Sequence, residues 1–200
     1  MTKIVFFCSP IGLGHATRDL AIINELKLES CKIYSGSSAI EFFQKNNVQA
    51  YDVYSPPKFE VQNGKLEKSL RWLWDYYKYY KKCKEISNQI INDEKPNLII
   101  SDEDFASIAI AQEKGISNII ITDILETKFT SGFGGIVEKK MNKTMHEMLN
   151  KSNRVIIPEL GENQNNIVRT GPIVRKIEKN REEIRNDLDF KKKTIVLSVG

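Results

Sequence analysis

A histidine follows two closely spaced glycines near the N-terminus, in the stretch CSPIGLGHAT at residues 8–17. Glycine lets a backbone turn tightly and approach a ligand, and the start of a following helix offers free amide groups to an anion. A histidine there can accept a proton from a hydroxyl group or donate a hydrogen bond. His15 is therefore a candidate general base or polar anchor; the alternative is a histidine that only caps or packs the turn. The positive end of the helix dipole is expected to keep its imidazole neutral.

The residues around this histidine limit what the loop could bind. Gly12, Gly14 and the hydroxyl groups of Ser9 and Thr17 could approach a bound phosphate. A dinucleotide fingerprint would need glycine or alanine at position 17 and an acidic residue about 20 residues later, at the end of the second strand, and the sequence has neither. A P-loop is excluded because no Gly-Lys-Ser/Thr follows.

Three acidic residues, Asp102, Glu103 and Asp104, follow a predicted strand. A carboxylate there could orient a sugar hydroxyl or steady His15, or it could cap the next helix. Asp104 directly precedes Phe105 and suits capping, so Asp102 is the candidate functional residue. No group of histidine, cysteine and acidic residues has the spacing of a metal site, and we therefore expect neither a metal nor a cofactor.

A second glycine-containing loop at residues 130–135 adds Gly134 and Gly135 as candidate residues for binding an acceptor or a phosphate. The helix predicted after it has an apolar stripe flanked by lysines. A long helix predicted at 66–93 mixes aromatic residues with lysines, and its second aromatic stripe exceeds what one buried face needs: Trp72, Tyr76 and Tyr79. Such helices either pack in a core or contact an acceptor or an anionic membrane.

Strand and helix patterns alternate along the chain. Short apolar runs predict strands at residues 3–8, 31–35, 48–54, 97–102 and 118–123. Apolar residues at helical spacing predict helices at 16–26, 37–46, 66–93 and 105–114. This alternation predicts an α/β fold in which helices cover both faces of a parallel sheet. Ligands bind at the carboxyl ends of such strands, where the glycine loop and Asp102 are both expected.

Composition narrows the class of protein. Of the 200 residues, 40% are hydrophobic and 28% are charged, which is typical of globular proteins. No segment is long and apolar enough to span a membrane, and the N-terminus lacks the pattern of a signal peptide. Cys8, Cys31 and Cys83 lack metal-site spacing, which indicates reduced thiols and a cytoplasmic protein. The lysine-rich helices leave peripheral contact with the inner face of the cell membrane open.

Four segments, in order, resemble MurG-like glycosyltransferases of family 28, which have the GT-B fold. Residues 9–26 (SPIGLGHATRDLAIINEL) resemble the glycine loop and first helix of that family. Residues 96–122 resemble its Pro-Asp-x-apolar-Asp segment with the following helix and strand. Residues 168–175 (VRTGPIVR) resemble the crossing between its two domains, and 181–200 resemble the start of the second domain.

The resemblance implies a Rossmann-like acceptor-binding domain at 1–170, followed at 171–200 by a linker and the start of a donor-binding domain. It implies transfer of a sugar from a nucleotide-linked donor, with UDP as the expected nucleotide, to an acceptor hydroxyl; no nucleic acid is expected as a partner. A lipid-linked acceptor is among the options. His15 would act as the base with help from Asp102. Because the family binds its donor mainly in the second domain, residues 1–200 alone are expected to be inactive. A sugar-nucleotide epimerase of similar fold, or a non-catalytic subunit that docks an acceptor or a membrane, is the alternative.

Overall fold

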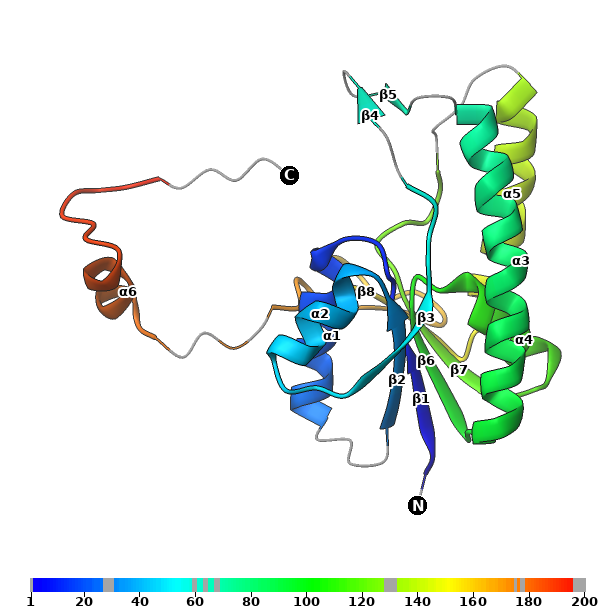
Figure 1. Ribbon diagram of the computed structural model, residues 1–200, viewed down its shortest axis with the longest axis horizontal. Helices are drawn as coiled ribbons and strands as arrows, with labels where there is room; N and C mark the ends of the chain where they lie inside the picture. The colour runs from blue at the N-terminus through cyan, green and yellow to red at the C-terminus, as the bar shows by residue number, and fades with distance from the viewer. Residues whose placement is uncertain are drawn as a thin grey trace.

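A computed structural model describes the fold. The described residues are 2–26, 31–58, 61–62, 65–66, 69–127, 133–174, 176 and 179–195. They form a seven-stranded sheet in the order β3-β2-β1-β6-β7-β8-β9, in which every pairing is parallel (Figure 1). The structure thus confirms the predicted α/β class and its Rossmann-like arrangement.

The strands of this sheet are short, as is usual for buried parallel strands. They are β1 (Ile4–Phe7), β2 (Cys31–Gly36), β3 (Ala50–Tyr54), β6 (Leu98–Asp102), β7 (Ser117–Ile121), β8 (Arg154–Ile157) and β9 (Ile167–Arg169). A separate antiparallel pair is formed by β4 (Val61–Gln62) and β5 (Lys65–Leu66). The five predicted strands are confirmed with shifts of one or two residues at their ends. Strands β8 and β9 were not predicted, because apolar runs of only four and three residues do not stand out in the sequence.

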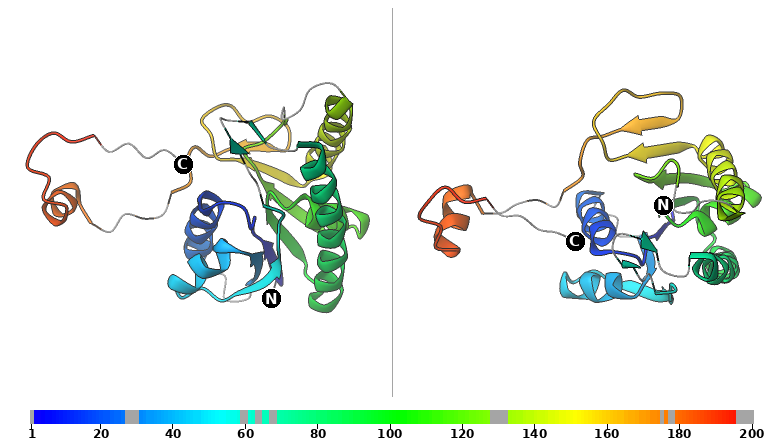
Figure 2. Two further views of the ribbon diagram at one scale, coloured as in Figure 1. Left: turned by 45° about the horizontal axis from the view of Figure 1, so that its top comes forward. Right: turned by 90° about the horizontal axis from the view of Figure 1, so that it is seen from above.

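Five of the six described helices cover the sheet, and the sixth stands apart from it. They are α1 (Leu13–Leu26), α2 (Ser38–Lys45), α3 (Ser69–Glu94), α4 (Phe105–Glu113), α5 (Phe133–Lys151) and α6 (Arg181–Asp187). In Figures 1 and 2, α1 and α2 cover one face of the sheet and α3, α4 and α5 cover the other. Helix α6 stands apart from the sheet and buries none of its residues. The division into domains at residue 170 stays a prediction.

Alternation along β1 shows how the two faces are built. Ile4 and Phe6 pack in a cluster with side chains of α1 and α2, whereas Val5 and Phe7 pack in a second cluster with side chains of α3 and α4. Successive strand side chains point to opposite faces, so a strand that is covered on both sides must be apolar throughout. Close contact between β2 and β3 also explains Gly36, because a Cβ there would lie 1.9 Å from the carbonyl oxygen of Tyr54.

Two predicted details differ from the structure. The loop predicted at 130–135 is helical in part, since α5 begins at Phe133 and Gly134 and Gly135 lie in its first turn; residues 128–132 lie outside the described residues. The exposed aromatic residues of α3 also differ from the second aromatic stripe noted in the sequence. Trp74 and Tyr77 are exposed, while the predicted stripe is half-buried through ring contacts among its own members: Trp72, Tyr76 and Tyr79.

The C-terminal prediction is only partly testable. Helix α6 confirms the predicted helix, but the strand predicted after it falls mainly on residues 196–200, which are outside the described part of the chain. Among the helices that the structure describes, none has the length and apolar content required to cross a bilayer.

Candidate functional site

The turn between β1 and α1 places His15 at the carboxyl edge of the sheet. Gly12 has φ +81°, a left-handed conformation that favours glycine, and α1 starts at the next residue. The two predicted hydroxyl ligands support this turn. Ser9 is buried and its Oγ accepts a hydrogen bond from the backbone of Ile11 at 3.4 Å. Thr17 Oγ1 donates to a backbone oxygen one turn earlier in α1 at 2.8 Å. The binding roles of Ser9 and Thr17 stay predictions.

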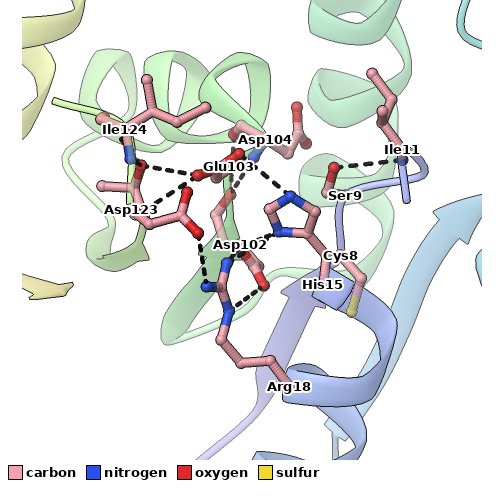
Figure 3. A network of polar contacts seen from close by, with 12 residues as sticks. Cys8, Ser9, Ile11, His15, Arg18, Asp102, Glu103, Asp104, Asp123 and Ile124 are labelled. Atoms are coloured by element: carbon pink, nitrogen blue, oxygen red, sulfur yellow. Dashed lines mark hydrogen bonds and ion pairs between the residues drawn. The ribbon is translucent and has the colours of Figure 1, made fainter. Parts of the chain in front are cut away.

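Two carboxylates from the end of β6 lie on opposite sides of the His15 ring (Figure 3). Nδ1 of His15 lies 3.1 Å from Oδ1 of Asp102, and Nε2 lies 3.4 Å from Oε2 of Glu103. Parallel pairing of β1 with β6 brings these residues together although they lie 87 positions apart in the sequence. The structure therefore confirms that His15 and Asp102 meet, and it adds Glu103.

Arg18 is the central residue that the sequence analysis missed. Its guanidinium donates from Nε to Oδ2 of Asp102 at 3.0 Å and from Nη2 to Oδ1 at 2.5 Å. Nη2 also lies 2.9 Å from Nδ1 of His15, and Nη1 lies 3.4 Å from Oδ2 of Asp123. Its position near His15 could have been predicted from the sequence, because residues three apart on a helix lie on the same face and Arg18 is three residues after His15.

The charges around His15 favour its protonated form more than its position at a helix start suggests. Burial lowers the pKa of His15, but the hydrogen bond and charge of Asp102 and the charge of Glu103 outweigh it, so the pKa is raised. For Asp102, burial alone would raise the pKa. Its hydrogen bonds from His15 and Arg18 dominate, and its pKa is lowered. Asp102 is thus an ionised carboxylate that favours an imidazolium, and this local field exceeds the effect of the helix dipole.

Glu103 has an unusual backbone and a perturbed carboxyl group. Its φ is +54°, and its amide donates to the carbonyl oxygen of Ile121 at 3.1 Å. Its Oε1 accepts hydrogen bonds from Thr122 Oγ1 at 3.1 Å and from the amide of Asp123 at 3.2 Å. Burial raises the pKa of Glu103 to about 7, and the neighbouring carboxylates of Asp123 and Asp102 add to the rise. Glu103 can therefore gain or lose a proton near neutral pH.

Asp19 lies beneath this cluster on α1 and is fully buried. Neither of its carboxyl oxygens has a hydrogen-bond partner among the described residues. Burial, together with the negative charge of Asp102, raises the pKa of Asp19 well above its usual range. Burial thus favours the neutral form of Asp19, since an isolated buried carboxylate would lose its hydration without compensation.

An open cleft of about 340 Å³ adjoins the cluster. Its walls come from the start of α1, the ends of β7 and β8 and the segment after β9, and they comprise Gly14, His15, Arg18, Asp123, Pro158, Glu159, Pro172 and Ile173. Of the predicted binding residues, Gly14 and His15 thus line the cleft. Gly134 and Gly135 do not line it, because they belong to the start of α5.

His15, Asp102 and Glu103 are close enough to be considered as metal ligands, since one ligand atom from each lies within 4.8 Å of the others. However, both oxygens of Asp102 already accept hydrogen bonds from Arg18. A divalent cation in this position would lie beside the guanidinium and experience its repulsion. These residues suit proton transfer better than metal binding, and the absence of a metal stays a prediction.

A scan against protein-family models and a search of curated proteins both give no match. Similar solved structures include MurG from Acinetobacter baumannii, at 12% identity and TM-score 0.52, which covers 88% of this chain and 47% of its own. The glycotransferase of kitacinnamycin is 12% identical at TM-score 0.59 and covers 90% of this chain and 54% of its own. A UDP-GlcNAc 2-epimerase from Methanocaldococcus jannaschii is 13% identical at TM-score 0.50 and covers 78% and 39%.

At such identities the likeness concerns the fold alone. The chain spans about half, or less, of the length of these structures. The similarity agrees with the seven-stranded parallel sheet and with the family resemblance of the sequence motifs. The chain therefore has the GT-B fold of the MurG-like type, of which it spans about half.

Proposed function

We propose that this chain is the acceptor-side half of a glycosyltransferase that moves a sugar from a UDP-linked donor to an acceptor hydroxyl. The proposal rests on one observation above all. His15, held by Asp102 and Arg18, is half-buried at the edge of a cleft at the carboxyl ends of the strands. This is where open α/β sheets bind their ligands. The GT-B fold and the UDP-GlcNAc enzyme among the similar structures support a nucleotide-sugar as the donor.

In the proposed mechanism, an acceptor hydroxyl gives its proton to Nε2 of His15. The hydroxyl oxygen then forms a bond to the anomeric carbon of the donor sugar, and the bond from that carbon to the diphosphate oxygen breaks. The nucleoside diphosphate leaves with the bonding electrons. The ionised Asp102 stabilises the imidazolium that forms, and Gly12 and Gly14 leave the start of α1 open to a phosphate.

An acceptor carried by a membrane lipid would fit the exposed side chains of helices α3 and α5. Trp74 and Tyr77 of α3 are exposed, and lysine side chains lie over both rings, Lys78 at 5.4 Å and Lys81 at 4.8 Å. Helix α5 also exposes apolar residues, next to lysines at 139, 140 and 143: Ile136, Val137 and Met141. Aromatic and basic residues together favour the headgroup region of an anionic membrane. We include peripheral membrane contact in the proposal.

A second candidate function is epimerisation of a sugar-nucleotide. Transfer needs one base, but two carboxylates contact the His15 ring, those of Asp102 and Glu103, and burial raises the pKa of Glu103 to about 7. Two groups that exchange protons near neutral pH suit a reaction that removes a proton from carbon and returns it. The product separates the candidates, since transfer releases UDP whereas epimerisation keeps the nucleotide attached.

The test uses the full-length protein, a panel of UDP-sugars, and measurement of both UDP release and the epimeric sugar-nucleotide. His15→Ala should lower turnover by about 10²–10⁴-fold, the contribution of a positioned base. His146, the second of the two histidines, is exposed on α5 and provides the matched control His146→Ala. Equal activity of wild type and His15→Ala would refute the assignment of the base. Epimer without UDP release would favour the second candidate.

A further inference from the structure

The orientation of the His15 ring leaves one contact unexplained by the proposed roles. Nδ1 faces Asp102 and Arg18, so Nε2 is the nitrogen available for substrate. Yet Nε2 lies 3.4 Å from Oε2 of Glu103. This is an ion-pair distance, and the contact is favourable when the pair carries one proton, either as an imidazolium beside a carboxylate or as a carboxylic acid beside a neutral imidazole. With no proton, a lone pair faces a negative oxygen; with two, hydrogen faces hydrogen.

The other carboxylates near His15 cannot hold that proton. Asp102 accepts two hydrogen bonds from the guanidinium of Arg18, which keeps it ionised and lowers its pKa. The pKa of Asp123 is lowered as well, first by its hydrogen bond with Glu103 and then by the charge of Arg18, whose guanidinium lies 3.4 Å away. Within the described part of the chain, no arginine or lysine forms an ion pair with Glu103, and its side chain is 10% exposed. His15 is therefore its cationic partner in the cluster.

We propose that Glu103 is the proton partner of His15 and that the two side chains hold a single shared proton. The proton resides either on Nε2, beside a Glu103 carboxylate, or on Glu103, which then donates to a neutral imidazole. Hydrogen bonds from Thr122 and from the amide of Asp123 hold the other oxygen of Glu103 in place. Glu103 thus sets the charge of His15, whereas Asp102 and Arg18 orient the ring.

The backbone of Glu103 supports a positioned role for this side chain. Its φ of +54° lies in the left-handed region, which is unfavourable for a residue with a Cβ. Such strain persists only where surrounding contacts enforce it, and it is common at functional sites. Here the backbone amide of Glu103 donates a hydrogen bond to the carbonyl oxygen of Ile121, which holds this conformation. The side chain thereby points from the end of β6 to the residues that follow β7.

This inference gains its catalytic meaning from the proposed function: Glu103 would return His15 to the neutral form that accepts a proton from an acceptor hydroxyl. The proton sharing itself is independent of substrate. It involves every charged group that faces Glu103, which are His15 and Arg18 from α1, Asp102 from β6 and Asp123 after β7. A titration without substrate therefore tests it separately from the proposed reaction.

The experiment is an NMR titration of the imidazole protons in the full chain, wild type and Glu103→Gln. The chain has two histidines, so His146 serves as an internal reference in every spectrum. Wild-type His15 should titrate in two steps, because Glu103 titrates in the same range. In Glu103→Gln, one step should remain, with its midpoint lower by about one pH unit or more, equivalent to a tenfold weaker proton affinity. Glutamine keeps the carbonyl oxygen that Thr122 contacts.

Two controls separate this result from general charge effects. Glu159→Gln removes a carboxylate from the same cleft without touching His15 and should leave the two-step titration intact. Asp102→Asn should lower the midpoint but retain both steps. As a measurement that needs no variant, the ¹³C shift of the Glu103 carboxyl should titrate near pH 7 rather than near pH 4. A His15 midpoint unchanged in Glu103→Gln, or a Glu103 carboxyl that titrates near pH 4, would overturn the inference.

Discussion

Arg18 holds the charges of the site together, and its removal tests the electrostatic reasoning most directly. We consider Arg18→Met, which keeps an apolar stem of similar length and removes the guanidinium. The variant leaves Asp102, which is fully buried, without its two strongest donors. Because the side chain of Arg18 is only 9% exposed, water cannot replace those donors without rearrangement of the cluster.

The expected loss follows from the burial of both partners. Removing one partner of a buried ion pair costs about 3–5 kcal/mol, whereas an exposed pair contributes at most about 1 kcal/mol. His15 remains beside Asp102 and can carry a positive charge, which offsets part of the loss. We therefore expect Arg18→Met to lower the free energy of unfolding by about 3 kcal/mol at pH 7.

The pH dependence provides an internal check on this number. Without Arg18, burial should raise the pKa of Asp102 in the folded protein above its unfolded value. The folded state then binds the extra proton, so the stability of the variant should rise as the pH falls toward 4. The loss relative to wild type should consequently be smaller at pH 4.5 than at pH 7.

The assay is urea unfolding followed by tryptophan fluorescence at both pH values, with Arg18→Met/Asp102→Asn as the matched double variant. Removing both charges leaves no uncompensated carboxylate, so the double variant should be more stable than Arg18→Met alone at pH 7. A loss below about 1 kcal/mol in Arg18→Met, the value for an exposed pair, would refute the reasoning. So would a double variant that is less stable than the single one.

Two further predictions concern other parts of the chain. Asp19→Asn should stabilise the protein against urea unfolding at pH 7. The pKa of Asp19 is higher in the folded than in the unfolded protein, so this acid lowers the stability of the wild type as the pH rises above its unfolded pKa. Equal stability of both proteins at pH 4 and pH 7 would contradict this. Sedimentation with anionic vesicles should show binding that weakens with salt and is reduced in Trp74→Ser/Tyr77→Ser. Equal binding by the variant would exclude this surface as the contact.

Much of the fold could be predicted because its determinants are local. The apolar runs at β1, β6 and β7 have the composition of strands buried on both faces, and helical spacing lies between them. Alternation of these elements implies a parallel sheet, and the parallel sheet implies that the strand ends share one edge. The positions of His15 and Asp102 at that edge follow from the same rule. β8 and β9 escaped prediction because three or four residues have too little periodicity.

The charge state of the site could not be predicted in this way. The sequence places His15 at a helix start, and from that position alone a neutral imidazole follows. In the folded chain, two carboxylates and one guanidinium within 3.4 Å of the ring decide its protonation. These groups come from elements far apart in the sequence, and Coulomb interactions depend on distance in space.

The sequence by itself therefore determined the α/β class, the edge that carries the site and the identity of the histidine at its centre, because periodicity and strand order are properties of the chain. Only the tertiary structure decided the roles of three acids. Asp102 pairs with Arg18, Glu103 faces Nε2 of His15, and burial raises the pKa of Asp19. Burial and distances of a few ångströms distinguish these three carboxyl groups, and both quantities exist only after strands β1, β6 and β7 have paired.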